Sequence, residues 1–304
     1  MPILGLLGAM LVAALLSLAL TPLDIRLATR LGAIDVPRDS RRMHTHPVPR
    51  LGGLSIFFSF LLLSLFYNYK IASDLFFVLS GAILIVLVGV LDDQLALPPS
   101  LKFFVQTAAV CVCAMDGGVF HVLNIGRQSI ELGILSLPVT LVFMLAMINA
   151  HNFIDGLDGL CAGVSLAESL AVGLHCLAAG STEFAHLGFL LGGACIGFLP
   201  YNVRGAKLFM GDTGSTFLGY MLAAIAVRTG EAPLILLLLF ALPLSDLVFA
   251  VIRRLIHGKN PFLPDRSHLH HLLCDRVGAY AASKILCFAS ALAAALGVLL
   301  SIQS

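Results

Sequence analysis

The stretch that decides the fold runs from residue 75 to residue 93 and reads LFFVLSGAILIVLVGVLDD. Residues 75–91 are uncharged and nearly long enough to cross a bilayer as a helix. The run then ends in two adjacent carboxylates, Asp92 and Asp93. Neighbouring carboxylates at a membrane edge repel each other and lose hydration, so they are tolerated where a cation or a proton offsets them. The stretch predicts a membrane helix that ends at a functional interface, with a solvated helix end as the alternative.

Apolar runs of similar length recur along the rest of the chain. Of its 304 residues, 59% are hydrophobic and 12% are charged, whereas a soluble domain carries about 25% charged residues. The net charge of +1 argues against a nucleic-acid-binding protein, which usually presents a basic surface. We therefore expect an all-α polytopic membrane protein, a single integral membrane domain over residues 1–304 with about ten transmembrane helices (ten or eleven). The ten candidate helices cover residues 3–23, 51–67, 75–91, 101–115, 132–149, 159–179, 185–200, 215–228, 232–252 and 284–302.

The distribution of positive charge predicts which loops face the cytoplasm, because cytoplasmic loops carry an excess of Lys and Arg. Only Lys70, Arg127 and Arg228 fall in the even-numbered loops. The other 15 of the 18 Lys and Arg residues lie in odd-numbered loops or at helix ends on the same side. The odd-numbered loops are therefore expected to be cytoplasmic. The first apolar run has no basic segment before it, so it is expected to be a retained helix and not a signal peptide.

The unusual polar residues fall on the same predicted side of the membrane. Scattered polar residues would divide between both sides, whereas one active site built from several loops would gather them on one. The sequence therefore predicts an active site at the cytoplasmic face. Its candidate residues are Asp92 and Asp93 in loop three, Asn152, Asp155 and Asp158 in loop five, Asn202 and Asp212 in loop seven, and His268, His270 and His271 in loop nine.

The densest of these segments reads NAHNFIDGLDGL and covers residues 149–160. Asp155 and Asp158 are three residues apart, so they would share a face if the segment were helical. Carboxylates and amides are ligands that Mg²⁺ accepts together with phosphate oxygens, and glycines let the backbone approach a ligand closely. The alternative is a polar turn between helices. The chain lacks the Ala-Arg and the further spaced Asp residues expected of CDP-alcohol phosphotransferases, so that interpretation is weak.

Two later segments have the composition of a phosphate site. The segment FMGDTGS (209–215) precedes an apolar helix, whose first amides favour an anion beside Asp212, with an ordinary helix cap as the alternative. The segment DRSHLHH (265–271) places Arg266 among three histidines. Zinc would suit these residue types, but a further ligand is missing apart from Cys274, so phosphate contact is favoured.

The first cytoplasmic loop ends in PVPRLGG (47–53), which contains Arg50. Positive charge alone would keep this loop inside, but it does not explain the prolines and glycines. Cations here would also attract an anionic lipid or a nucleotide.

Together these segments resemble the polyprenyl-phosphate N-acetylhexosamine-1-phosphate transferase superfamily (glycosyltransferase family 4). They look most like bacterial undecaprenyl-phosphate N-acetylglucosamine-1-phosphate transferases. The matching motifs occur in the family's order and span residues 35–272: PVPRLGG (47–53), LDD (91–93), NFIDGLDGL (152–160), FMGDTGS (209–215) and PDRSHLHHL (264–272).

The resemblance implies a bacterial inner-membrane enzyme that starts cell-surface polysaccharide assembly. It would use UDP-N-acetylhexosamine, undecaprenyl phosphate and Mg²⁺ or Mn²⁺, within membrane lipid and without nucleic acid, and it could form a homodimer. Asp212 is implied as the metal ligand. The implied catalytic residues are Asp92, Asp93, Asp155, Asp158 and His268, and the implied substrate-binding residues are Arg50, Asn152, Asn202, Arg266, His270 and His271.

Three other functions are alternatives to this one. The closest is the muropeptide branch of the same superfamily, a phospho-N-acetylmuramoyl-pentapeptide transferase. That branch typically carries TPTMGG where this chain has PVPRLGG. A membrane transporter is disfavoured because no repeat is visible and the carboxylates gather at one interface. A catalytically inactive binding protein is the remaining alternative. The residues do not choose among N-acetylated sugars, or between direct attack and a covalent Asp intermediate.

Overall fold

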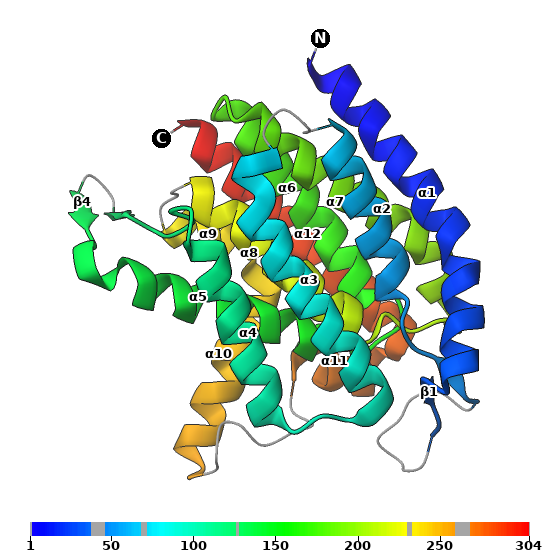
Figure 1. The fold of residues 1–304 in the computed structure, drawn as a ribbon. Helices are drawn as coiled ribbons and strands as arrows, with labels where there is room; N and C mark the ends of the chain where they lie inside the picture. Colours follow the sequence, from blue (N-terminus) through cyan, green and yellow to red (C-terminus); the bar gives the residue numbers. More distant parts are fainter. Residues whose placement is uncertain are drawn as a thin grey trace.

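The computed structural model describes residues 2–37, 46–67, 72–125, 128–229, 233–258 and 268–303. Arg266, one of the predicted substrate-binding residues, lies outside the described residues. Helices dominate the chain (Figure 1). Their bounds are α1 Pro2–Leu31, α2 Gly53–Tyr67, α3 Ala72–Leu95, α4 Pro99–Ala114, α5 Ser136–Ile154, α6 Leu160–Ala178, α7 Thr182–Asn202, α8 Gly211–Thr229, α9 Pro233–Leu239, α10 Ala241–Ile256, α11 Leu269–Val277 and α12 Ala279–Gln303.

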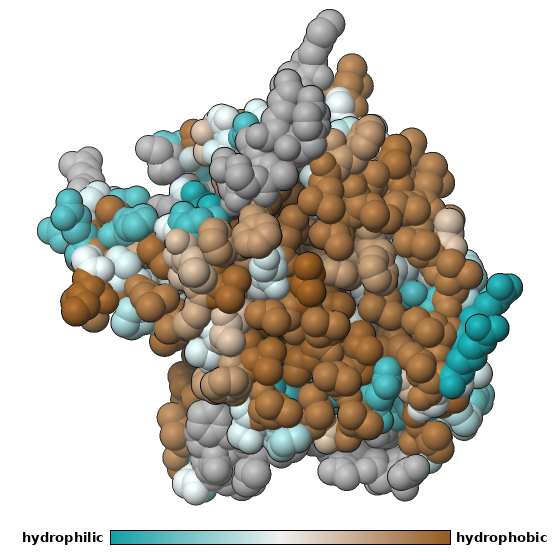
Figure 2. Space-filling view, in the orientation of Figure 1, coloured by the Kyte–Doolittle hydropathy of each residue, from teal (hydrophilic) through white to brown (hydrophobic). Residues whose placement is uncertain are grey.

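Each of the ten apolar runs expected from the sequence overlaps a helix, but the expected count of ten membrane spans is not confirmed. Six helices in the described ranges are long and apolar enough to cross a membrane, or seven if α9 and α10 form one broken span. These two helices meet at an angle of 99°, so the ninth run is not one straight helix. Helices α2 and α4 are apolar but shorter. Hydrophobic residues cover much of the face shown in Figure 2. The structure is therefore a polytopic helical membrane protein with fewer clear spans than apolar runs.

Helix α8 explains part of the difference, because it lies inside the protein and not against lipid. Nearly all of its side chains are buried, including the polar Thr213, Ser215 and Thr216. It packs mainly against α3 and α5, where the Tyr220 hydroxyl donates to the Val78 carbonyl at 3.0 Å. A helix surrounded by protein does not need the apolar composition of a lipid-facing one, so α8 carries polar residues into the core.

The PVPRLGG segment has a structural role that connects the N-terminal part of the chain to α8. Strand β2 (Val48–Pro49) lies in this segment and pairs antiparallel with β1 (Ile34–Asp35). Elsewhere in the chain, β3 (Val122–Ile125) pairs antiparallel with β4 (Gln128–Glu131). The Gly52 and Gly53 amides then donate to the carbonyls of Phe209 and Met210, both at 3.0 Å. A methyl group on Gly53 would overlap the backbone of Gly214. The paired glycines therefore let α2 begin directly against the first turn of α8.

Candidate active site

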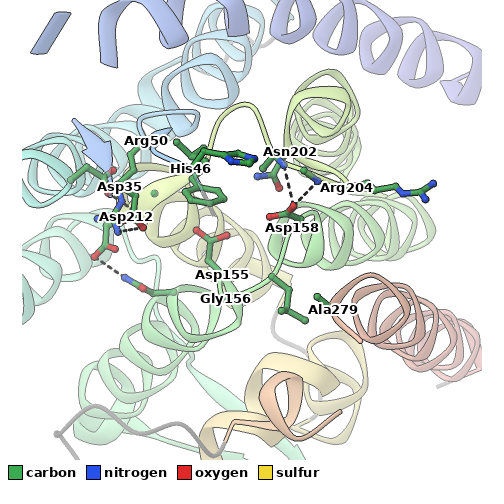
Figure 3. Close-up of a pocket in the computed structure, with 18 of the residues that line it drawn as sticks. Asp35, His46, Arg50, Asp155, Gly156, Asp158, Asn202, Arg204, Asp212 and Ala279 are labelled. Atoms are coloured by element: carbon green, nitrogen blue, oxygen red, sulfur yellow. Dashed lines mark hydrogen bonds and ion pairs between the residues drawn. The ribbon is translucent and has the colours of Figure 1, made fainter. Parts of the chain in front are cut away.

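A cavity of about 620 Å³ lies where the α5–α6 turn, the α7–α8 loop and the segment before α2 come together (Figure 3). It gathers predicted residues that are far apart in sequence. Asp92, His268 and His270 do not line it. The predicted residues that line it are Arg50, Asp93, Asn152, Asp155, Asp158, Asn202, Asp212 and His271.

Asp212 lies in the first turn of α8 and is held by side chains from two other helices. Its Oδ2 accepts from Lys102 Nζ on α4 at 2.9 Å and from Asn152 Nδ2 on α5 at 2.8 Å. Lys102 also donates to Asp92 Oδ2 at 3.0 Å, so one ammonium group bridges two carboxylates. Asp92 is thereby placed beside Asp212, although it does not line the cavity. Among the described residues, the partners of these two carboxylates are the side chains of Lys102 and Asn152, apart from the Leu97 amide that also donates to Asp92.

Asp93 occupies a different position from its neighbour, because its carboxylate caps α8. It accepts from the amides of Asp212 at 3.0 Å and Thr213 at 3.1 Å, and from the Thr213 hydroxyl at 2.7 Å. An acidic group at a helix N-terminus satisfies free amides and complements the helix dipole. Gly211 has a φ of 71°, and a Cβ there would meet the Asp93 carboxylate. The ordinary helix cap that was the alternative for the FMGDTGS segment is therefore supplied by Asp93 of α3 and not by that segment itself.

Asp155 faces the cavity from the turn between α5 and α6. Because α5 ends at Ile154 and α6 begins at Leu160, Asp155 and Asp158 do not share a helical face as the sequence suggested. Burial raises the pKa of Asp155 well above its ordinary value, and the negative charges of Asp212 and Asp93 raise it further. The cavity thus concentrates negative charge that a cation would relieve.

Asp158 and Asn202 join loops at the other end of the cavity. Asp158 Oδ2 accepts from the amides of Gly205 at 2.8 Å and Ala206 at 3.0 Å. Asn202 is buried, accepts from the Gly159 amide at 3.1 Å and donates to the Leu208 carbonyl at 3.0 Å. These contacts hold the α5–α6 turn against the α7–α8 loop. Their predicted catalytic and substrate-binding roles stay predictions.

The three histidines take three different environments. His268 Nδ1 lies 2.8 Å from Asp246 Oδ2, and the other Asp246 oxygen accepts the Leu269 amide at 2.6 Å. His270 is buried against Gly156, and burial lowers its pKa to about 4, so it is neutral at neutral pH. His271 lines the cavity. Within the described ranges, no three His, Cys, Asp or Glu residues are arranged to hold a metal ion, so this part of the chain gives no support to zinc at the histidines.

Sequence reasoning missed several residues of the site. In the sequence, Lys102 indicates only which side of the membrane is cytoplasmic. Its position shortly after the Asp pair and Pro98-Pro99 could have suggested a role in the site. Arg50 reaches the cavity in an ion pair with Asp35 at 2.9 Å, and sequence gave no reason to join these two. The further lining residues include His46, Arg204, Phe209 and Tyr280.

The carboxylates that line the cavity fit a magnesium ion that the protein coordinates only in part. Mg²⁺ keeps several waters and binds through one or two carboxylates together with substrate phosphates. Asp212 and Asp155 offer such carboxylates in the same cavity, and burial, with the charges of Asp212 and Asp93 in addition, raises the pKa of Asp155. The residues therefore suit a cation that arrives with a phosphate-bearing substrate better than a cage formed by protein alone.

Comparison with known proteins agrees with this geometry. The model of the family described as glycosyl transferase family 4 matches residues 75–230. A probable undecaprenyl-phosphate N-acetylglucosaminyl 1-phosphate transferase of Bacillus subtilis is 33% identical over 87% of this chain and 76% of its own length.

Two further relatives extend the match. A decaprenyl-phosphate N-acetylglucosaminephosphotransferase of Mycobacterium tuberculosis is 35% identical over 81% of this chain and 70% of its own length. An undecaprenyl-phosphate alpha-N-acetylglucosaminyl 1-phosphate transferase of Escherichia coli K12 is 31% identical over 90% of this chain and 78% of its own length. The motifs, the cavity and these matches together show that the chain belongs to glycosyl transferase family 4.

Proposed function

We propose that the chain transfers an N-acetylhexosamine-1-phosphate, with N-acetylglucosamine as the preferred sugar, from its UDP derivative to a polyprenyl phosphate. UMP is released, and the product is a lipid-linked sugar pyrophosphate. The observation that carries the proposal is the centre formed by Asp92, Lys102 and Asp212, of which Asp212 lines a cavity built from five motif segments. The names of the relatives, which give polyprenyl phosphate acceptors and N-acetylglucosamine, support it.

The chemistry requires several phosphate groups to meet, so mutual negative charge is the main obstacle. A phosphate oxygen of the lipid attacks the β-phosphorus of the UDP-sugar, and the bond to the UMP oxygen breaks. Bound Mg²⁺ would neutralise charge on the pyrophosphate. Asp212 and Asp155 would hold that ion. Arg50 and His271, which both line the cavity, would donate to phosphate oxygens.

Lys102 has a defined part in this proposal. In the structure its ammonium group bridges Asp92 and Asp212. With Asp212 holding a metal ion, the long Lys102 side chain could turn to a phosphate oxygen of the donor, because both of its partners are side chains. Asp92, which would keep the Leu97 amide as a donor to Oδ1, could then accept a proton from the lipid phosphate on Oδ2.

The site is proposed to face the cytoplasm of a bacterial membrane. The support is the excess of positive charge on the loops that carry the site. The homodimer, undecaprenyl as the particular lipid, and the polysaccharide pathway stay predictions.

The test is UMP release by purified, detergent-solubilised protein given undecaprenyl phosphate, Mg²⁺ or Mn²⁺ and one donor at a time. The donors are UDP-N-acetylglucosamine, other UDP-N-acetyl sugars and UDP-muramoyl-pentapeptide. Lipid-dependent release from UDP-N-acetylglucosamine supports the proposal. Release only from the pentapeptide donor would assign the chain to the muropeptide branch, and release that does not require lipid would contradict the acceptor.

A further inference from the structure

A second hollow lies outside the active site, on the apolar surface between α6 and α12. This groove has a volume of about 750 Å³ and is lined almost wholly by apolar side chains. Leu174, Phe288 and Leu299 line it and are 40%, 66% and 59% exposed. On α6 its lining begins at Gly163, one turn after the active-site segment ends at Leu160. The groove thus begins near the predicted cytoplasmic face and runs towards the opposite one.

One stripe of residues along α12 joins this groove to a first cation, Lys284. Lys284 lies one helical turn before Cys287 and Phe288, which line the groove, and one turn after Tyr280, which lines the active-site cavity. The stripe from Lys284 to Leu299 is ~22 Å long at the rise of an α-helix. Positive charge is therefore placed at the cytoplasmic end of an apolar surface that is long enough to contact much of an acyl chain.

The second cation comes from the α7–α8 loop. The Arg204 guanidinium carbon lies 5.2 Å from the centre of the Tyr280 ring, and Lys284 Nζ lies 4.3 Å from the same centre. Both cations are exposed, and in the described part of the chain neither forms an ion pair with a carboxylate. Arg204 has a φ of 44°, a left-handed conformation, and the next two amides are held by Asp158. Asp158 thus holds the backbone next to Arg204, and the cations of Arg204 and Lys284 both contact the ring of Tyr280.

We infer that Arg204, Lys284 and the α6–α12 groove form a binding site for an anionic glycerophospholipid of the bilayer. The phosphate would lie between the two cations, over Tyr280, and an acyl chain would lie along the groove. Basic residues near a membrane surface attract anionic lipids, and Arg pairs well with phosphate oxygens. The site joins an anion-binding head to an apolar channel, which matches the chemistry of such a lipid.

The direction of Arg204 favours a resident lipid over the reacting acceptor. Its backbone borders the cavity, but its side chain extends away from Asp155 and Asp212 (Figure 3). A phosphate held by the guanidinium group would therefore lie beside the reaction site and not inside it. The inference does not depend on the proposed reaction, because its test measures binding in the absence of the sugar donor.

The test uses delipidated full-length protein in detergent, titrated with dioleoyl phosphatidylglycerol or dioleoyl phosphatidylcholine and followed by native mass spectrometry. The wild-type protein should bind one phosphatidylglycerol in preference to phosphatidylcholine. Lys284→Gln should weaken phosphatidylglycerol binding roughly fivefold. Ala295→Phe, which fills the groove from α12, should weaken binding of both lipids. Lys284 does not line the cavity, so UMP release by its variant in phosphatidylcholine bilayers should equal that of the wild type.

Two matched substitutions control for general effects of charge and bulk. Arg30→Gln removes an exposed cation at the end of α1, and Ala289→Phe adds bulk to an exposed position of α12 outside the groove; neither should change lipid binding. Equal binding of the two lipids by the wild type, or unchanged binding by Lys284→Gln or Ala295→Phe, would overturn the inference. Displacement of phosphatidylglycerol by undecaprenyl phosphate would assign the groove to the acceptor. Conversion of a dimer to a monomer by Ala295→Phe would assign it to a second copy of the chain.

Discussion

Asp212 and Asp158 lie at opposite ends of the active-site cavity (Figure 3). They belong to similar motifs, but different kinds of group donate to their carboxylates. Asp212 is held by the side chains of Lys102 and Asn152. Asp158 is held by two backbone amides of one loop, and its own carbonyl accepts from the Ser283 hydroxyl. Side chains can exchange partners when a substrate arrives, whereas backbone amides are released only if the loop moves. We therefore propose that the chemistry takes place at the Asp212 end and that the Asp158 end positions the loop.

Removing the carboxylate at the reactive end should have the largest effect on activity. Asp212→Ala should lower kcat at least ~100-fold at saturating Mg²⁺, which is above the usual effect of residues that only support a metal site. The protein should still fold, because in the part of the chain that the structure describes no backbone amide donates to the Asp212 carboxylate. Steady-state UMP release and Tm in detergent measure the two expectations. Retention of more than about a tenth of the activity would refute Asp212 as the metal ligand.

Replacing Lys102 should have the second-largest effect on activity, because its ammonium group contacts both Asp92 and Asp212. Lys102→Met removes the shared cation and should lower kcat by ~10- to 100-fold. Lys102→Arg keeps the charge and should recover part of this loss. Both variants are assayed for UMP release over a range of Mg²⁺ concentrations. Full activity of Lys102→Met at low Mg²⁺ would show that the bridge between Asp92 and Asp212 has no part in turnover.

Asp155 offers a test of the crowded negative charge through pH and metal removal. An acid whose pKa is raised in the folded state destabilises the fold as pH rises above its ordinary pKa of 3.8, and fully so above the raised pKa. In EDTA, Asp155→Asn should therefore match the wild type in Tm near pH 4 and exceed it increasingly towards pH 8. Mg²⁺ with UDP should stabilise the wild type more than the variant. Parallel Tm curves for the two proteins would contradict this account of the charge.

The smallest effect on activity is expected at the positioning end. Asp158→Ala leaves the Gly205 and Ala206 amides without their acceptor and should lower the free energy of unfolding by about 1–3 kcal/mol. The kcat of the folded protein should fall by less than ~10-fold. Thermal unfolding and UMP release per folded molecule measure the two quantities. A larger loss of kcat with unchanged stability would move Asp158 to the reactive group.

Much of the site could be predicted from sequence because its residue types are costly at a membrane edge. Adjacent Asp residues and clustered histidines stand out against a chain with 12% charged residues. Sequence could not divide their roles. Asp92 and Asp93 are neighbours, yet one meets a lysine and the other caps a helix that begins more than a hundred residues later. Only the packing of α3 against α8 separates them.

The fold shows the same limit. Apolar runs located the helices, but they did not reveal that α8 lies inside the protein or that the ninth run breaks between α9 and α10. Hydropathy reports how apolar a segment is and not whether lipid or protein surrounds it. The Gly52-Gly53 pair could have suggested close packing of backbones, although its partner at Gly214 lies in a distant motif.

Single-turnover product formation with excess enzyme tests the central comparison most directly. Asp212→Asn and Asp158→Asn are the same chemical change at the two ends of one cavity, and each rate is corrected for the folded fraction. The account predicts that Asp212→Asn slows the step at least ~100-fold while Asp158→Asn stays within ~10-fold of the wild type. Equal losses in the two variants, or a greater loss at Asp158, would contradict the assignment of chemistry to the Asp212 end.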